Sequence, residues 1–410
     1  LMSTPTPTLW LRRGRERSLK RRHPWVFSGA IARVVGDPGP GDTVDVRSAD
    51  GELLARAAYS PHSQIRARAW TFRDEPVDEA LIARRLEAAI AARGGPAAGG
   101  PEGACRLVYA EADGLPGVIV DRYADTLVIQ LATAGAERWR SPIANLLPAV
   151  TGVQRVWERS DVEVRALEGL EPRVGPLAGE EPPPRIAVRE GGLRLWVDVH
   201  HGHKTGLYLD QRNNRGRVGE LAAGRRVLDA FCYSGGFTVH ALAGGAASVL
   251  AVDASADALA MTRANLELNG LAAETCELVE GNVFEVLRGL RDRGRTFDLI
   301  VLDPPKFAAT ASQRERAARG YKDINLLAFK LLEAGGVLAT FSCSGAIGGE
   351  LFQSIVAGAA LDAGVEAQVV ERLGQPADHP VLLSFPESEY LKGLVCRVGD
   401  HLPARAGSRI

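Results

Sequence analysis

The sequence predicts an α/β protein in which a small β-barrel and a central α+β region precede a seven-stranded, doubly wound sheet. Short apolar segments alternate with helical patterns from Leu193 onward, as in a doubly wound sheet. Residues 9–72 instead contain many short strand-like segments, which are typical of an all-β unit. The length of 410 residues exceeds one typical core. We therefore expect three domains, at 1–75, 76–190 and 191–410.

The composition is that of an ordinary soluble protein, with 46% hydrophobic and 24% charged residues. No apolar stretch approaches the roughly 18 residues of a membrane span. The N-terminal segment has no apolar core ahead of a cleavage site, so it does not resemble a secretory signal. We expect a cytoplasmic protein with no membrane association. The five cysteines are scattered and show no CxxC pairing, which predicts neither a disulfide framework nor a metal site.

Basic residues are concentrated near the N-terminus although the net charge of the chain is only −1. A single acidic residue, Glu16, lies among them. A local patch of this kind is expected where a protein contacts phosphates, and a solvated arm without a partner is the alternative. The seven basic residues are Arg12, Arg13, Arg15, Arg17, Lys20, Arg21 and Arg22.

The rest of the first region predicts strands, and the Asp50-Gly51 pair between two alternating segments predicts a hairpin. The central region mixes both element types and ends in a proline-rich stretch at 176–185. Helices are predicted there at 78–93 and 137–150, and strands at 106–109, 117–121, 126–131 and 153–160.

The C-terminal region contains seven predicted strands, and the last two have no helix of sufficient length between them for a parallel crossover. Five parallel strands followed by an antiparallel hairpin resemble the class I (Rossmann-like) methyltransferase architecture. The strands are predicted at 226–231, 248–252, 277–280, 297–302, 337–342, 366–372 and 390–398.

Candidate cofactor residues follow the first three of these strands. Gly235 and Gly236 lie at a turn into a helix, where a ligand can approach backbone N–H groups; a tight connection without a ligand is the alternative. The pattern is not GxGxxG, so the dinucleotide fingerprint is missing. Asp253 ends the second strand, where an acidic side chain can bind ribose hydroxyls, although a helix cap is an alternative role. Asn282 and Val283 follow the third strand and are candidates for an adenine contact.

Two further strands end in reactive groups. Asp303 begins the sequence DPPKF, where Pro304 and Pro305 restrict the backbone and so hold the carboxylate in place. Cys343 follows an apolar strand and has small polar neighbours, Ser342 and Ser344, which leave a thiol accessible. Adjacent parallel strands end at one crevice, so we expect the carboxylate and the thiol to face the same ligand.

These motifs together resemble a known family over nearly the whole chain. The family is that of the bacterial large-subunit ribosomal RNA 5-methylcytosine methyltransferases of the PUA-containing type. The segments similar to it are GRERSLKRRHPWVFSGAI, HGHKTGLYLDQRNNR, VLDAFCYSGGF, VLDPPKF, YKDINLLAFKLLEAGG, FSCSG, DHPVL and FPESEYLKG. The resemblance implies an N-terminal PUA domain, a central α+β domain and a C-terminal domain that uses S-adenosylmethionine.

The resemblance also implies roles for particular residues. Cys343 would attack carbon 6 of the target cytosine, and Asp303 would hold or protonate the ring nitrogen and amine side of the base. Arg212 and Lys306 would join the basic N-terminal residues in contacting ribosomal RNA. The residues implied at the cofactor are Asp229, Tyr233, Gly235, Gly236, Asp253, Asn282, Val283 and Gln211.

Several alternatives remain open at this stage. Related enzymes methylate uracil at carbon 5 or methylate guanine, so these reactions are alternatives for this chain. A further alternative is that the chain is an inactive RNA-binding assembly factor. A nicotinamide-dependent dehydrogenase is disfavoured by the missing GxGxxG pattern. The sequence does not identify the modified nucleotide, the base that removes the carbon 5 proton, or whether the substrate is naked RNA or an assembly intermediate. It also leaves the oligomeric state open, a homodimer included.

Overall fold

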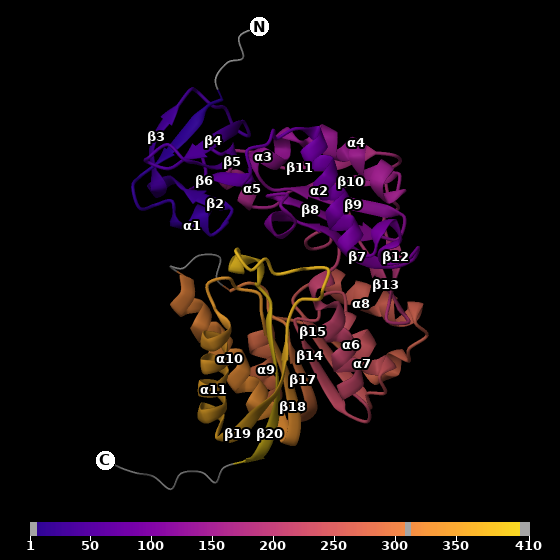
Figure 1. Ribbon diagram of the computed structural model, residues 1–410. Helices are drawn as coiled ribbons and strands as arrows, with labels where there is room; N and C mark the ends of the chain where they lie inside the picture. The colour runs from indigo at the N-terminus through magenta and orange to yellow at the C-terminus, as the bar shows by residue number, and fades with distance from the viewer. Residues whose placement is uncertain (1–5, 308–312, 402–410) are drawn as a thin grey trace, which may run out of the picture. The chain divides into compact units, whose positions relative to one another are not determined.

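The computed structural model describes residues 6–307 and 313–401, in which the chain forms two compact units (Figure 1). Residues 1–5, on which the absence of a secretory signal partly rests, lie outside this description. Neither described range contains a helix that is long and apolar enough to cross a membrane. The three-domain division of the chain stays a prediction. Unit 1 comprises Leu1–Arg189, Val197–Leu209 and Ala377–Glu389, and unit 2 comprises Glu190–Trp196, Asp210–Pro376 and Tyr390–Ile410.

The first part of unit 1 is a six-stranded sheet with the order β2-β6-β5-β4-β1-β3. Its neighbouring strands are antiparallel except for β1 and β4. The predicted hairpin at Asp50-Gly51 is present, and Gly51 has the positive φ of 95° that such a turn favours. The elements are β1 (Thr8–Leu11), α1 (Arg17–Lys20), β2 (Trp25–Phe27), β3 (Ile31–Val35), β4 (Thr43–Arg47), β5 (Leu53–Tyr59) and β6 (Ile65–Thr71).

The second part of unit 1 is a five-stranded sheet with the order β11-β10-β9-β8-β7. Trp70 of the first sheet packs into the same apolar core as helix α2, whose N-terminus is capped by Asp78. The elements are α2 (Glu79–Ala92), β7 (Ala104–Tyr109), β8 (Val118–Tyr123), β9 (Thr126–Leu131), α3 (Ala134–Arg138), α4 (Arg140–Thr151), β10 (Arg155–Ser160), α5 (Val164–Leu167) and β11 (Arg173–Ala178). A two-stranded sheet of β12 (Ile186–Glu190) and β13 (Leu193–Val197) follows.

Unit 2 contains the seven-stranded sheet, with the order β16-β15-β14-β17-β18-β20-β19. The five strands β14 to β18 are parallel to one another, and β20 is antiparallel to both of its neighbours. The predicted doubly wound sheet with a terminal hairpin is therefore confirmed. The strands are β14 (Arg226–Ala230), β15 (Ser248–Asp253), β16 (Cys276–Glu280), β17 (Phe297–Leu302), β18 (Leu332–Ser342), β19 (Val365–Leu373) and β20 (Lys392–His401).

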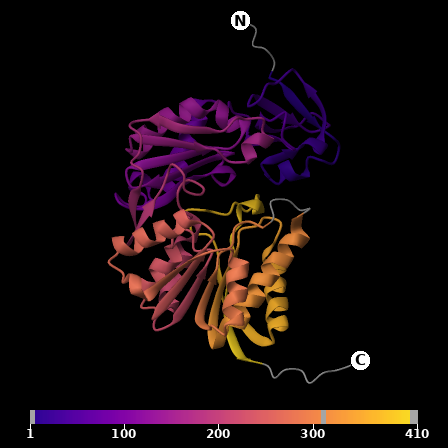
Figure 2. The same ribbon diagram turned by 180° about the vertical axis from the view of Figure 1, so that it is seen from behind.

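Helices cover both faces of this sheet. Apolar residues of α6, α7 and α8 pack on one face, and those of α9, α10 and α11 pack on the other. Figure 2 shows the second set from the side on which α10 and α11 lie in front of the sheet. The helices are α6 (Arg212–Leu221), α7 (Gly236–Ala243), α8 (Ala256–Leu268), α9 (Val283–Asp292), α10 (Arg314–Leu331) and α11 (Gly349–Ala363).

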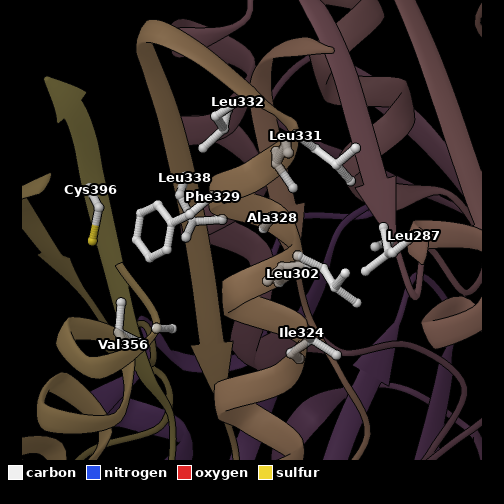
Figure 3. Close-up of a cluster of buried hydrophobic side chains, with 14 of the residues drawn as sticks. Leu287, Leu302, Ile324, Ala328, Phe329, Leu331, Leu332, Leu338, Val356 and Cys396 are labelled. Atoms are coloured by element: carbon white, nitrogen blue, oxygen red, sulfur yellow. The ribbon is translucent and has the colours of Figure 1, made fainter. Parts of the chain in front are cut away.

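Strand β17 illustrates why the sequence forms a central parallel strand. Leu299 and Val301 face the α6–α7 core, whereas Ile300 and Leu302 face the core on the α10 side. A strand buried on both faces has a continuous apolar sequence instead of an alternating one. Figure 3 shows side chains of α9, α10 and α11 meeting those of β17, β18 and β20 in the α10-side core.

Candidate active site

The carboxyl ends of the parallel strands are level with one another. Ala230 pairs with both Val252 and Leu302, and Leu302 pairs with Thr340. The strand order reverses between β14 and β17, and ligands of open α/β sheets bind outside the carboxyl ends at such a point. The predicted site residues that follow these ends therefore share one edge of the sheet: Tyr233, Gly235, Gly236, Asp253, Asn282, Asp303 and Cys343.

The two glycines of the loop after β14 are each required by close neighbours. Gly235 has a φ of +74°, and a Cβ atom there would lie 2.4 Å from Cγ2 of Thr262. A Cβ atom on Gly236 would lie 2.6 Å from Cδ of Arg215. Gly236 is also the first residue of α7, so the loop brings bare backbone to a helix N-terminus.

The same loop contains two non-glycine residues with positive φ, Phe231 at 65° and Tyr233 at 49°. Such backbone persists only where the surroundings hold it. The Tyr233 N–H donates to Asp253 Oδ2 at 2.9 Å, and the Thr262 hydroxyl donates to the Tyr233 carbonyl at 3.1 Å. Asn265 donates at 2.8 Å to the carbonyl of the next residue in the loop. Helix α8 and the end of β15 thus fix the shape of the loop.

Asp229 lies beneath this loop and is completely buried. The Thr238 hydroxyl donates to its Oδ2 at 2.6 Å, whereas its buried Oδ1 has no hydrogen-bond partner among the described residues. Burial raises the pKa of Asp229 to about 7. A buried carboxylate oxygen without a partner fits a ligand that carries a positive charge or a donor.

The residues after β15 and β16 make local contacts. Asp253 is half-buried, and its Oδ1 accepts from the Ser255 N–H at 3.0 Å. The Asn282 side chain caps α9 by accepting from the Phe284 N–H at 3.0 Å. Val283 is buried in the core on the α10 side of the sheet. The ribose and adenine contacts of these residues stay predictions.

A buried ion pair supports the glycine loop from below. Arg215 binds both oxygens of Glu190 at 2.6 Å, and both side chains are almost fully buried. Burial lowers the pKa of Arg215, but the carboxylates of Glu190, Asp210 and Asp303 together raise that pKa above its ordinary value. His240 lies 3.4 Å from Glu190 and contacts the Gly236 carbonyl at 2.9 Å through Nδ1. Burial lowers the pKa of His240.

Asp303 is held by a residue from a different element. Gln211 Nε2 donates to Asp303 Oδ1 at 2.9 Å, and Gln211 Oε1 accepts from Asn214 at 2.6 Å. Asn214 also donates to the Gly374 carbonyl at 3.1 Å. Gln211 and Asn214 are buried, whereas Asp303 is half-buried. Gln211 therefore orients the Asp303 carboxylate. The contact of Gln211 with the cofactor stays a prediction.

The half-buried Cys343 precedes Ser344, which is held by side chains from two other elements. Lys392 donates to the carbonyl of Ser344 at 2.9 Å and to that of Tyr390 at 2.7 Å. The buried Tyr321 hydroxyl lies 2.9 Å from the Ser344 hydroxyl, and its ring packs 4.7 Å from that of Phe307 in the DPPKF segment. Tyr321 thus joins the segments that carry Asp303 and Cys343.

Three other cysteines have surroundings that disfavour a thiolate. Burial raises the pKa of Cys232 well above its ordinary value and raises those of Cys276 and Cys396 to about 12. Cys105 is buried. Cys232, in the cofactor loop, packs against Ala251 and Leu259. Cys276 is only partly buried.

The predicted RNA-binding residues lie on three segments. All seven basic residues from Arg12 to Arg22 are exposed, in and around α1. Lys20 forms a 2.8 Å ion pair with Glu52, whose hydrogen bond raises the pKa of Lys20. Lys306 is exposed after the two prolines, and Arg212 is half-buried at the start of α6.

Sequence reasoning missed the residues that support the site from a distance. Thr262 and Asn265 lie inside an ordinary helical pattern, and Glu190 lies in a strand well before the site. Only Arg215 carried a signal, since it belongs to the quoted segment HGHKTGLYLDQRNNR. A buried Asn in a helix needs hydrogen-bond partners, but the burial of Asn265 is not visible in the sequence.

The sheet order, the glycine loop after β14 and the unsatisfied carboxylate beneath it define an S-adenosylmethionine-dependent methyltransferase. Residues 174–396 match the family described as S-adenosylmethionine-dependent methyltransferase, and residues 9–72 match the PUA-like domain family. The cofactor is S-adenosylmethionine. It carries cationic groups, which fit the unpaired oxygen of Asp229.

Relatives of known name match nearly the whole length of the chain. The ribosomal RNA large subunit methyltransferase I of Cronobacter sakazakii is 51% identical over 391 residues, which cover 95% of this chain and 99% of the relative. The protein of the same name from Klebsiella pneumoniae is 50% identical over 393 residues, covering 96% and 98%. This chain belongs to the ribosomal RNA large subunit methyltransferase I family.

Two solved structures share the fold at lower identity. SMU.776 complexed with SAH is 22% identical with a TM-score of 0.84, and the match covers 95% of this chain and 100% of that chain. A Streptococcus mutans protein proposed as an S-adenosylmethionine-dependent methyltransferase is also 22% identical, with a TM-score of 0.83 and the same coverage. At this identity the likeness concerns the fold alone.

Proposed function

We propose that this chain methylates carbon 5 of a cytosine in large-subunit ribosomal RNA, with Cys343 as the nucleophile. The observation that carries the proposal is the placement of a thiol and a carboxylate, Cys343 and Asp303, after the neighbouring parallel strands β18 and β17. The names of the relatives support ribosomal RNA as the substrate class. The action of the chain in the cytoplasm is part of the same proposal.

The chemistry explains why a thiol is needed. The Cys343 sulfur bonds to carbon 6 of the cytosine, and the electron pair of the 5,6 double bond moves to carbon 5, which becomes nucleophilic. Asp303, oriented by Gln211, binds the ring nitrogen and amine side of the extruded base. Carbon 5 takes the electrophilic methyl group that the cofactor would supply, and S-adenosylhomocysteine leaves. Loss of the carbon 5 proton to a base then breaks the carbon–sulfur bond and restores the double bond.

The cofactor would be held by the residues at the ends of β14, β15 and β16. Asp229 offers its unpaired oxygen to a cationic group, and the Gly235-Gly236 backbone allows close approach. Asp253 would take the ribose hydroxyls, and Tyr233, Asn282 and Val283 would complete the pocket. The exposed basic residues from Arg12 to Arg22, with Arg212 and Lys306, would contact RNA phosphates, which position the substrate without selecting the base.

The direct test is methyl transfer from labelled S-adenosylmethionine to unmodified large-subunit RNA, followed by digestion to nucleosides. We expect labelled 5-methylcytidine with the wild type and none with Cys343→Ala. Cys276→Ala is the matched control, because this half-buried thiol lies at the other end of its strand from the predicted site and should be dispensable.

Trapping adds a test of the covalent step. RNA with 5-fluorocytidine in place of cytidine cannot lose a proton from carbon 5, so the adduct should accumulate as a complex that survives denaturation. The wild type and Cys276→Ala should form this complex, and Cys343→Ala should not.

Other outcomes point to the alternatives. Labelled 5-methyluridine would assign the uracil reaction. Labelled guanosine that is unaffected by Cys343→Ala would make Cys343 a packing residue and overturn the covalent mechanism. Cofactor binding without any methyl transfer to RNA would favour an assembly factor.

A further inference from the structure

The segment Ala377–Glu389 connects β19 with β20 of unit 2 but belongs to unit 1. The segment is anchored at both ends on β7 of the five-stranded sheet. Asp378 Oδ2 accepts from the Arg106 N–H at 3.1 Å, and the Tyr109 hydroxyl donates to the Ser388 carbonyl at 2.8 Å. Both ends of the segment are therefore tied to β7.

The second anchor lies on β2 of the first sheet. The Phe385 ring is 4.7 Å from that of Trp25 and 5.4 Å from that of His23, and Phe385 is buried. The Glu387 carboxylate lies 3.2 Å from His23 Nε2. These contacts place the segment next to the end of the basic stretch, since Arg22 directly precedes His23.

Between the two anchors the chain makes a tight turn with Leu383 at its tip. Leu382 and Phe385 form a β-bridge, and the Phe385 N–H donates to the Leu382 carbonyl at 2.8 Å. The Ser388 hydroxyl accepts from the Leu382 N–H at 3.0 Å and donates to the Phe385 carbonyl at 2.6 Å. The turn is thus fixed from both sides.

This fixed turn exposes 98% of the Leu383 side chain. Single exposed apolar residues are common, but turn tips favour Gly, Asn, Asp, Pro or Ser. A large apolar side chain on a preorganised turn loses little conformational freedom when it inserts into a partner. The turn is therefore suited to insertion.

The neighbouring surface indicates which partner fits. Phe27 is 49% exposed and its ring lies 6.2 Å from that of Trp25, which in turn contacts the Phe385 ring. The exposed basic residues of α1 and Arg22 precede these aromatic residues in the chain. Positive charge combined with exposed aromatic and apolar side chains is typical of a surface that binds nucleic acid through phosphates and base faces.

We infer that Leu383 is an apolar wedge that inserts between two stacked bases of the RNA, while the basic residues around α1 hold the adjacent phosphates. Apolar side chains used in this way unstack a base step and bend the helix. Unstacking lowers the cost of extruding a base for chemistry. This inference rests on the proposed function and adds a second kind of RNA contact to it.

The test compares Leu383→Ser with Leu361→Ser, a control in α11 whose leucine is also exposed, to 67%. Binding of the full chain to unmodified large-subunit RNA is measured across a range of salt concentrations. We expect Leu383→Ser to weaken binding by about tenfold at every salt concentration, because an apolar contact releases no counterions. Leu361→Ser and Leu383→Met should stay within about twofold of the wild type.

A second readout reports unstacking directly. Acylation of RNA 2′-hydroxyl groups should increase at specific nucleotides when the wild type binds, and Leu383→Ser should lose this increase. Equal affinity and equal acylation for Leu383→Ser and the wild type would overturn the inference. If the wild type itself shows no salt-dependent binding to this RNA, the proposed function fails instead.

Discussion

Gln211 donates a 2.9 Å hydrogen bond to Asp303 and is itself held by Asn214. A carboxylate that must bind a nucleobase in one orientation depends on neighbouring hydrogen bonds that hold it in place. Gln211→Ala should therefore lower kcat by about tenfold to a hundredfold, in addition to any loss of the predicted cofactor contact. Steady-state kinetics and a cofactor titration check this. A large rise in the cofactor Kd with an unaltered kcat would instead make Gln211 a cofactor ligand.

The buried carboxyl group of Asp229 predicts a pH-dependent cofactor affinity. Because its pKa is raised from 3.8 to about 7, Asp229 is largely protonated at lower pH and must ionise to bind a cation. The affinity for S-adenosylhomocysteine should rise about tenfold between about pH 5.5 and about pH 7. Calorimetric titration should show this rise in the wild type and a weak, flat profile in Asp229→Asn. Asp298→Asn, at the opposite end of β17, is the control that should keep the rise.

The same raised pKa has a consequence for stability. A group that holds its proton more tightly in the folded state stabilises that state in full below its unfolded pKa. For Asp229 this contribution is present below about pH 4 and is lost as the pH rises through about 7.

The Glu190–Arg215 pair predicts a large loss of stability when one partner is neutralised. Both side chains are buried, so Glu190→Gln leaves the Arg215 guanidinium without its counterion. Breaking such a pair costs about 3–5 kcal/mol of unfolding free energy. The matched control is Glu371→Gln, which removes a more exposed ion pair with Arg217 at 2.7 Å and should cost about 1 kcal/mol or less. Urea unfolding measures both, and equal losses would contradict this account.

Gly235 and Gly270 form a natural comparison, because both have positive φ, at +74° and +62°. An Ala side chain would be strained at either position, by about 1 kcal/mol. At Gly235 it would also meet Thr262, whereas no atom lies within 4 Å at Gly270. Gly235→Ala should therefore weaken cofactor binding by more than about tenfold, and Gly270→Ala should leave it unchanged. Fluorescence titration of the cofactor decides between these outcomes.

Much of unit 2 follows from local pattern. The apolar segment of β17 followed by Asp303, and the apolar segment of β18 followed by Cys343, are visible in the sequence, and the parallel sheet then brings both to one edge. Asn282 shows the limit of this reasoning. A polar residue after a strand can contact a ligand or cap a helix, and here its oxygen is used as a cap.

The contacts by which distant elements support the candidate site could not be predicted from the sequence. Asn265 binds the Ser234 carbonyl from inside a helix, and Glu190 meets Arg215 from a separate strand. Neither contact leaves a periodic trace, since each depends on how distant elements pack. The packing of Ala377–Glu389 on β2 and β7 was missed for the same reason.

Unit 1 contains a segment that follows most of unit 2 in the sequence, and this constrains the order of folding. Trp25 packs on Phe385, although Asp210–Pro376 of unit 2 lies between these two residues in the sequence. During synthesis most domains fold soon after they leave the ribosome. Unit 1 cannot do so completely, because its segment Ala377–Glu389 is translated after Asp210–Pro376 of unit 2. Until that segment has been translated, the Trp25 ring lacks its contact with Phe385, and unit 1 is incomplete.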